Sequence, residues 1–234
     1  MSVIEIKSLV KTYTENIVPV HALNGIDLTF ERGEFTAVVG PSGCGKTTLL
    51  NMMGGLDKPT EGTVIIEGTD ITQLPAGKLV DFRLKNIGFV FQSYNLIPVL
   101  NVEENVEFIM QLQHRNKKET HDRVSYLMDA MGLPDKLKVR PKYLSGGQQQ
   151  RVAVARALAS KPKFILADEP TANLDSKSSA ALLDLMAGMN EKENVTFIFS
   201  THDQRVMDKA KRIVTLEDGK VISDVKTVKD NNEE

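Results

Sequence analysis

The sequence has a single cysteine, Cys44, no tryptophan and no long run of apolar residues. One cysteine excludes an intrachain disulfide and favours a reducing compartment such as the cytosol. Apolar runs such as 164–167 have the length of a buried strand, and a membrane-spanning helix needs about 18 such residues. The amino-terminal segment alternates apolar and polar residues, so we expect a strand there and not a signal peptide.

The charge is almost balanced, with 29 Lys and Arg against 31 Asp and Glu in 234 residues. This balance gives no general attraction to nucleic acid or to an anionic membrane surface. We therefore expect no nucleic-acid partner, and we expect any contact with a membrane to pass through another protein. The length fits one large domain.

Three patterns divide the chain. Residues 1–36 and 62–91 carry short alternating runs with turn pairs, which predict an antiparallel β-subdomain. Residues 37–61 and 160–225 interleave apolar strand runs with helical patterns, which is typical of a parallel α/β core. Residues 92–159 lack strand signals and predict an inserted helical subdomain. The expected fold is a single α/β domain over the whole chain, with a parallel core, an antiparallel β-subdomain and a helical subdomain.

The most specific motif is GPSGCGKTT at residues 40–48, which matches G-x-x-x-x-G-K-[ST] and follows the apolar run FTAVV. Its glycines allow the backbone N–H groups to face inward, and the helix that follows favours anions at its start. A chance glycine-rich turn is the alternative. We expect ATP as the ligand, with its phosphates against Gly40, Pro41, Ser42, Gly43, Cys44, Gly45, Lys46, Thr47 and Thr48.

Within this loop, Lys46 is expected over the β- and γ-phosphates and the Thr47 hydroxyl on Mg²⁺, with Thr48 near the α-phosphate. Cys44 occupies a variable position of the motif, where a small filler residue suffices. Because of its location, we expect a bulky thiol reagent at Cys44 to block nucleotide binding.

A second motif, KFILADEP at residues 163–170, is an apolar strand that ends in two carboxylates. Open α/β sheets bind ligands at the carboxyl ends of their strands. Asp168 is expected to hold Mg²⁺, and Glu169 to accept a proton from the water that attacks the γ-phosphate. A solvated strand end is the alternative for this motif alone, but together with the 40–48 loop it completes a Mg-nucleotide site.

The run LSGGQQQRVAVARALA at residues 144–159 resembles the signature of the ABC ATPase family. From the residues alone, Ser145, Gly146 and Gly147 open a helix and offer a second anion site, with a plain helix cap as the alternative. The resemblance implies a RecA-like phosphate-loop core and a head-to-tail homodimer with two ATP at its interface. Each ATP then lies between the 40–48 loop of one subunit and Ser145 to Gln148 of the other.

Other positions match the family as well. The resemblance implies that Tyr13 stacks on adenine, Gln92 reaches the metal and the attacking water, and His202 contacts the γ-phosphate. Asp175, in ANLD, matches a loop that crosses the dimer interface. As isolated residues, Tyr13, Gln92 and His202 could each be structural. The implied catalytic group is Glu169, His202, Gln92 and Lys46, and the implied metal ligands are Thr47, Gln92 and Asp168.

Within the family, the runs GGLDKPTEG, IGFVFQSYNLIP and NVEENV resemble the lipoprotein-releasing, macrolide-exporting and cell-division cassettes. This implies an ATPase subunit at the cytoplasmic face of a bacterial-type inner plasma membrane. It would power export, lipoprotein extraction or force transmission through a separate integral membrane permease, contacted near residues 92–100. The alternatives are a soluble ABC ATPase for assembly or repair and a non-hydrolysing regulatory cassette.

Overall fold

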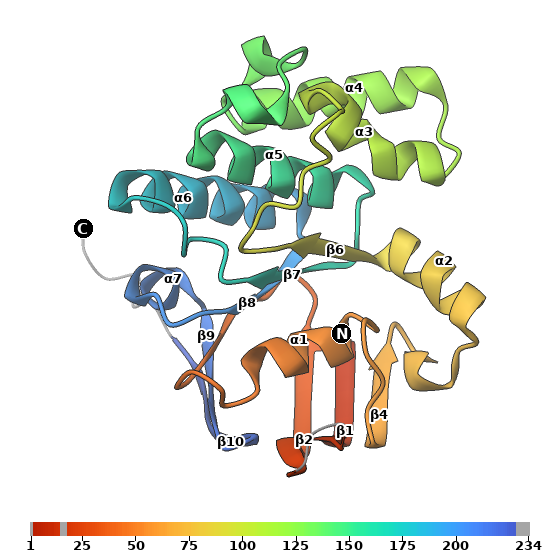
Figure 1. Ribbon diagram of the computed structural model, residues 1–234, viewed down its shortest axis with the longest axis vertical. Coiled ribbons are helices and arrows are strands. Elements are labelled where there is room, and N and C mark those ends of the chain that lie inside the picture. Colours follow the sequence, from red (N-terminus) through yellow and green to blue (C-terminus); the bar gives the residue numbers. More distant parts are fainter. Residues whose placement is uncertain (1, 15–17, 228–234) are drawn as a thin grey trace.

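Two β-sheets and a layer of helices form the structure (Figure 1), a computed structural model that describes residues 2–14 and 18–227. One sheet contains β1 (Ser2–Tyr13), β2 (Val20–Glu31), β4 (Glu61–Ile66) and β5 (Thr69–Asp70). The other contains β3 (Phe35–Val39), β6 (Ile87–Val90), β7 (Phe164–Asp168), β8 (Thr196–Ser200), β9 (Arg212–Glu217) and β10 (Lys220–Lys226). Their orders are β2-β1-β4-β5 and β10-β9-β3-β8-β7-β6.

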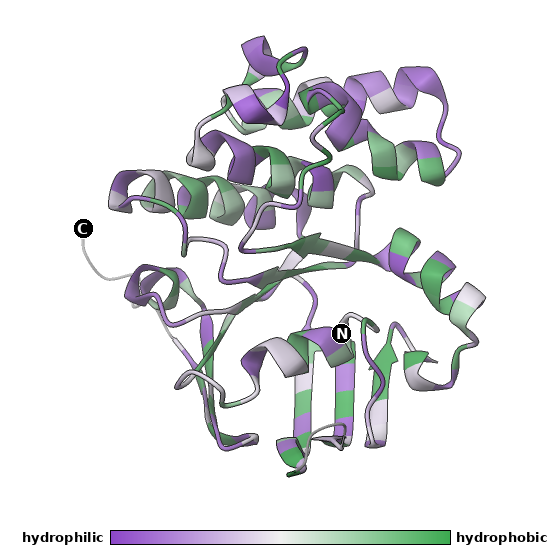
Figure 2. Ribbon diagram, viewed as in Figure 1, coloured by the Kyte–Doolittle hydropathy of each residue, from purple (hydrophilic) through white to green (hydrophobic). Residues whose placement is uncertain are grey.

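The smaller sheet is antiparallel, with β1 paired to both β2 and β4. Hydrophobic and hydrophilic residues alternate along these strands (Figure 2), so that one face is apolar. This face buries Ile4, Leu23 and Val64 among others, in a cluster shared with α1 (Lys46–Met53). The sheet therefore packs onto the helix that follows the 40–45 loop.

The expectation for residues 62–91 was wrong in its second half. Only 61–70 belong to the antiparallel sheet, and they are followed by a short turn at Ile71–Gln73 and by α2 (Ala76–Asn86). Strand β6 then joins the larger sheet, parallel to β7. Its residues IGFV are almost all buried, and such a continuous apolar run is typical of a parallel strand covered on both faces.

The larger sheet forms the core, with five parallel strands and β10 as an antiparallel edge. Strands β3 and β8 are buried at every position, and they are neighbours in the sheet beside β7. Because these three strands are parallel, their carboxyl ends meet at one edge. The segments that begin there are the 40–45 loop, Glu169 and the Thr201–His202 pair.

Residues 92–159 form the expected helical subdomain with α3 (Val102–Leu112), α4 (Lys117–Ala130) and α5 (Gly146–Ala159). A capping box of Asn101 and Glu104 starts α3. Short turns at Pro134–Lys136 and Pro141–Tyr143 separate α4 from α5, and each begins with a proline. None of the helices in the described segments has the length and apolarity to cross a membrane.

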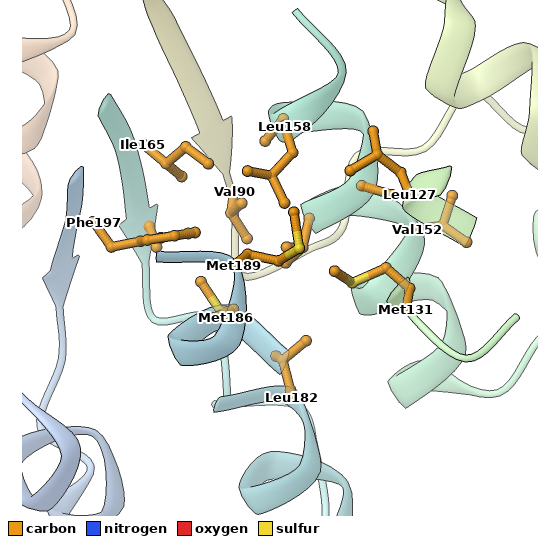
Figure 3. Close-up of a cluster of buried hydrophobic side chains, with 14 of the residues drawn as sticks. Val90, Leu127, Met131, Val152, Leu158, Ile165, Leu182, Met186, Met189 and Phe197 are labelled. Carbon is orange, nitrogen blue, oxygen red and sulfur yellow. The ribbon is translucent and has the colours of Figure 1, made fainter. Parts of the chain in front are cut away.

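Helix α6 (Ser176–Glu193) lies between the helical subdomain and the core sheet, and α7 (Gln204–Lys209) follows β8 (Figure 1). Side chains from all three parts meet in one cluster (Figure 3), with Leu127 and Val152 from the helices, Met186 from α6 and Phe197 from the sheet. Since these side chains share one hydrophobic core, α5 packs directly against α6 and the sheet.

Candidate functional site

A cavity of about 670 Å³ opens at the sheet edge where β3, β7 and β8 end. It brings together residues that lie far apart in the sequence but were predicted to share one site. Its lining consists of Tyr13, Val20, Ala22, Gly40, Pro41, Ser42, Gly43, Gly45, Lys46, Thr47, Thr48, Gln92, Glu169, Ala172, Ser200 and His202.

The 40–45 loop needs its glycines. Gly40, Gly43 and Gly45 have φ of 148°, 81° and 104°, which L side chains rarely adopt. A Cβ at Gly40 would lie 2.1 Å from the Leu216 carbonyl oxygen, and one at Gly45 would lie 2.4 Å from that of Ala22. The loop is therefore pressed against two neighbouring strands. Helix α1 begins directly after it without a side-chain cap, so its first N–H groups can bind an anion.

Lys46 is the cation of this loop, and its side chain is buried. Its Nζ donates hydrogen bonds of 2.8 Å to the carbonyl oxygens of Gly40 and Pro41. The ammonium group is thus held at the loop beside the cavity. Its charge is available to a phosphate because these two partners are neutral carbonyls.

Oxygen donors suited to a hard cation lie next to this lysine. Thr47 Oγ1 is 3.2 Å from both carboxylate oxygens of Asp168. Gln92 lines the same cavity and adds an amide. A hydroxyl, a carboxylate and an amide form the all-oxygen set that Mg²⁺ prefers, so the residues present fit this ion.

Glu169 and His202 form a pair across the ends of β7 and β8. His202 Nδ1 lies 2.8 Å from Glu169 Oε1. The backbone of Glu169 is strained, with φ of 46°, and its N–H donates to the Ser200 carbonyl oxygen at 2.9 Å. The other carboxylate oxygen, Oε2, is buried and has no protein partner. One oxygen of Glu169 is therefore held by His202, and the other is enclosed by protein. As a carboxylate that lines the cavity beside His202, Glu169 can act as a base.

Two residues that the sequence did not single out connect this pair. The Thr171 hydroxyl donates to Asp203 Oδ2 at 2.8 Å, which ties the segment after Glu169 to the residue after His202. Hydrogen bonds from the Arg205 guanidinium, and then from Thr171 and the Arg205 N–H, outweigh burial and lower the pKa of Asp203 from 3.8 to about 2. The sequence did carry a signal for Asp203: an aspartate directly before a helical pattern is a typical helix N-cap, and this one follows His202.

Two amide side chains link the site to the helical subdomain. Gln150, which is fully buried in α5, donates to the Pro170 carbonyl oxygen at 2.8 Å and to that of Phe91 at 3.3 Å. Asn173 donates to the backbone oxygen of Gln92 at 2.9 Å. These contacts join the signature helix, the Gln92 segment and the loop after Glu169. The sequence motifs did not indicate them.

The signature residues lie apart from the cavity, and none of residues 145–148 lines it. Helix α5 begins at Gly146, and Ser145 caps it. Ser145 Oγ accepts from the Gln148 N–H, and Gln148 Oε1 accepts from the Ser145 N–H. Asp175 likewise caps α6 by accepting from Ser178, which lowers the pKa of its carboxyl group. Within one chain, the two predicted anion sites are therefore separate.

Cys44 does not face the ligand side of the loop. Its side chain is 5% exposed and packs in the hydrophobic cluster under the loop, 3.9 Å from Lys46 Nζ. Only its backbone can face a phosphate. The expected block of nucleotide binding by a bulky thiol reagent is thus not supported, because the reagent cannot reach this sulfur in the folded loop.

A family model described as ABC transporter matches residues 23–172. The chain belongs to the ABC transporter family. An uncharacterized ABC transporter ATP-binding protein of Methanocaldococcus jannaschii is 46% identical over 219 residues, covering 94% of this ABC chain and 97% of the relative. The macrolide export ATP-binding/permease protein MacB of Hyphomonas neptunium is 44% identical over 221 residues, covering 94% of this chain and 34% of MacB.

Solved structures agree with the ABC fold. The dimeric post-hydrolysis state of the ATP-binding cassette MJ0796, bound to ADP and Pi, matches with a TM-score of 0.87 and 41% identity. The match covers 95% of this chain and 98% of that one. The expected phosphate-loop fold and the ABC-type ATPase class are therefore confirmed, and the soluble assembly or repair ATPase is not favoured.

We predict that Asp203→Asn destabilises the ABC chain by up to about 2 kcal/mol at pH 7, because the lowered pKa stabilises the folded state only while Asp203 is ionised. A depressed folded-state pKa means that the unfolded state binds more protons between pH 4 and 2. The difference from the wild type should therefore vanish as the pH falls through that range.

Urea unfolding at pH 7, 4 and 2.5 measures this difference, with Asp208→Asn, an exposed position on the same helix, as the matched control. An equal loss at pH 2.5 and pH 7 would contradict an electrostatic origin.

Proposed function

We propose that two copies of this ABC ATPase close head to tail around two Mg-ATP and drive a separate membrane permease. The separation of the cavity from residues 145–148 carries this proposal. The start of α5 is a second predicted anion site, and it lies outside the cavity of its own chain. It could still bind a nucleotide if it covered the cavity of another copy. The dimeric state of the MJ0796 cassette supports this arrangement.

In each cavity, Lys46 would leave its carbonyl partners for the β- and γ-phosphates. Thr47, Asp168 and Gln92 would hold Mg²⁺, which neutralises charge that develops on the phosphates. The Glu169 carboxylate would take a proton from the attacking water, and His202, which lies 2.8 Å from Glu169 Oε1, would contact the γ-phosphate. Ser145 to Gln148 and Asp175 of the second copy would complete the site.

An apolar groove of about 440 Å³ supports the permease contact. It lies between α2, β6 and the start of the helical subdomain, and Phe89, Phe91, Ile97 and Phe108 line it. Two cations also line it, and both are bonded to backbone carbonyls: Arg83 to Gly55, and Arg156 to Tyr94 and Asn95. An amphipathic helix with an acidic residue would complement this surface.

The groove refines the contact expected near residues 92–100. Asn95 and Ile97 line it, whereas Leu96 packs against the core and Tyr94 OH lies toward Gly146 in the signature helix. MacB joins an ATP-binding part to a permease in one chain, which supports an integral membrane partner for this one. We place the chain at the cytoplasmic face of the membrane, in an export, lipoprotein-extraction or force-transmitting system.

Glu169→Gln tests the assignment of the base. It should retain ATP binding, accumulate as an ATP-bound dimer and lose about 10²–10⁴-fold in kcat, because the neutral amide can no longer accept a proton. Size-exclusion chromatography with ATP and a phosphate-release assay measure the two effects. Glu191→Gln, an exposed position, is the control. Full turnover by Glu169→Gln would refute the assignment.

Ile97→Lys tests the permease groove. A third cation in a groove that already holds two should prevent docking of the partner helix while the isolated dimer keeps its ATPase rate. Purification of the tagged chain from membranes, with quantification of the integral membrane subunit that accompanies it, measures docking. Val99→Lys is the matched control, because Val99 is 71% exposed and does not line the groove. Equal recovery of the permease with both variants would exclude the groove.

A further inference from the structure

Lys11 and Tyr13 lie two residues apart on β1 and are joined by a third residue, Asp57. Lys11 Nζ lies 4.7 Å from the centre of the Tyr13 ring. The same ammonium group pairs with both oxygens of Asp57, at 3.0 and 2.9 Å. The Tyr13 hydroxyl donates to Asp57 Oδ2 at 3.1 Å. The tyrosine ring is thus held at its tip by Asp57 and on one face by Lys11.

The loop that carries Asp57 is itself fastened to β1. Lys11 Nζ donates to the Lys58 carbonyl oxygen at 2.8 Å, and the Asp57 carboxylate accepts from the Lys58 N–H at 2.7 Å. Farther along, the Thr60 N–H bonds to the Val10 carbonyl oxygen and the Thr12 N–H to Thr60 Oγ1. Asp57 therefore has a fixed position relative to the strand that carries Tyr13.

The protonation states of Asp57 and Tyr13 at neutral pH favour the hydrogen bond between them. Burial alone would raise the pKa of Asp57, but the Lys11 ammonium, the Lys58 N–H and the Tyr13 hydroxyl together hold it below its usual value. Burial raises the pKa of Tyr13. Asp57 is therefore ionised while Tyr13 keeps the proton that it donates. Lys11 is only 13% exposed, so its ion pair is shielded from water more than a surface pair.

Asp57 also connects the ring to the phosphate-binding loop. Helix α1 starts at Lys46 in that loop and ends at Met53, four residues before Asp57. The Leu56 N–H bonds back to the Asn51 carbonyl oxygen at 2.9 Å, so the connection is short and ordered. At 1.5 Å per residue, this eight-residue helix spans about 12 Å. Tyr13 lines the cavity with the loop residues.

We propose that Lys11 and Asp57 are positioning residues that fix the Tyr13 ring as the platform for the nucleotide base. They hold the base subsite at a set distance from the phosphate subsite through α1. This inference rests on the proposed role of Tyr13 as the base-stacking residue.

Calorimetric titrations with MgADP and with magnesium pyrophosphate test the inference, because pyrophosphate fills only the phosphate subsite. Lys11→Met and Asp57→Ala should each weaken MgADP binding about five- to twenty-fold, because the Tyr13 ring would lose the cation–π contact or the hydrogen bond that holds it in place for the base. Pyrophosphate affinity should stay within about two-fold, and kcat at saturating ATP should be retained while KM rises. Asp57→Asn, which keeps an acceptor for the Tyr13 hydroxyl, should recover part of the ADP affinity.

Lys7→Met is the matched control, since Lys7 is an exposed lysine on the same strand whose partner, Glu5, is also on β1. A parallel loss of ADP and pyrophosphate affinity would overturn the inference, because Asp57 would then act on the phosphate loop itself. Tyr13→Ala separates the remaining outcomes. If it lowers ADP affinity alone while Lys11→Met and Asp57→Ala do not, the positioning role is refuted and the stacking role stands. If Tyr13→Ala also has no effect, the role of Tyr13 itself is refuted.

Discussion

Parallel pairing of β3, β7 and β8 is the constraint on which the rest of the structure depends. Their predominantly apolar and almost entirely buried sequences require a sheet covered on both faces, and the parallel register places all three carboxyl ends at one edge. The phosphate loop, the carboxylates and His202 each begin within a few residues of those ends. The sheet alone thus brings together site segments that lie more than 150 residues apart in the sequence.

The same sheet leaves the signature helix outside the cavity but not disconnected from it. Gln150 donates to backbone oxygens on two segments of the site, at Phe91 and Pro170. Asn173 donates to the oxygen of Gln92, next to Phe91. The hydrophobic cluster around Met186 continues this connection into the helical subdomain. A movement of the helical subdomain must therefore displace the Gln92 segment, which borders the apolar groove. In the proposed assembly, ordinary packing and these amide hydrogen bonds would link the nucleotide state to the partner contact.

Local patterns in the sequence predicted most of the core and the cavity. Glu169 directly follows an apolar strand, and Lys46 and Thr47 follow another after the 40–45 loop. This order indicates that they lie at one sheet edge. Two expectations failed for physical reasons. Strand β6 has only four residues, which are too few for the sequence pattern to show whether the strand belongs to the parallel or the antiparallel sheet. The direction of the Cys44 side chain depends on the curvature of the loop, which the motif does not specify. The contacts of Asp57 with β1 and of Gln150 with the Pro170 segment join residues far apart in sequence. Such contacts depend on tertiary packing, which no single motif encodes.

Complementation between two inactive variants tests most directly whether two copies build one nucleotide site. Lys46→Ala damages the phosphate loop, and Ser145→Arg damages the helix start that faces the other copy. In a mixed dimer of the two variants, one site pairs both lesions and the other carries neither. Each variant alone should therefore be inactive, whereas an equimolar mixture should regain about a quarter of the wild-type ATPase rate, as expected for random pairing in a two-fold dimer. No recovery in the mixture, or full activity of Ser145→Arg alone, would contradict the shared site.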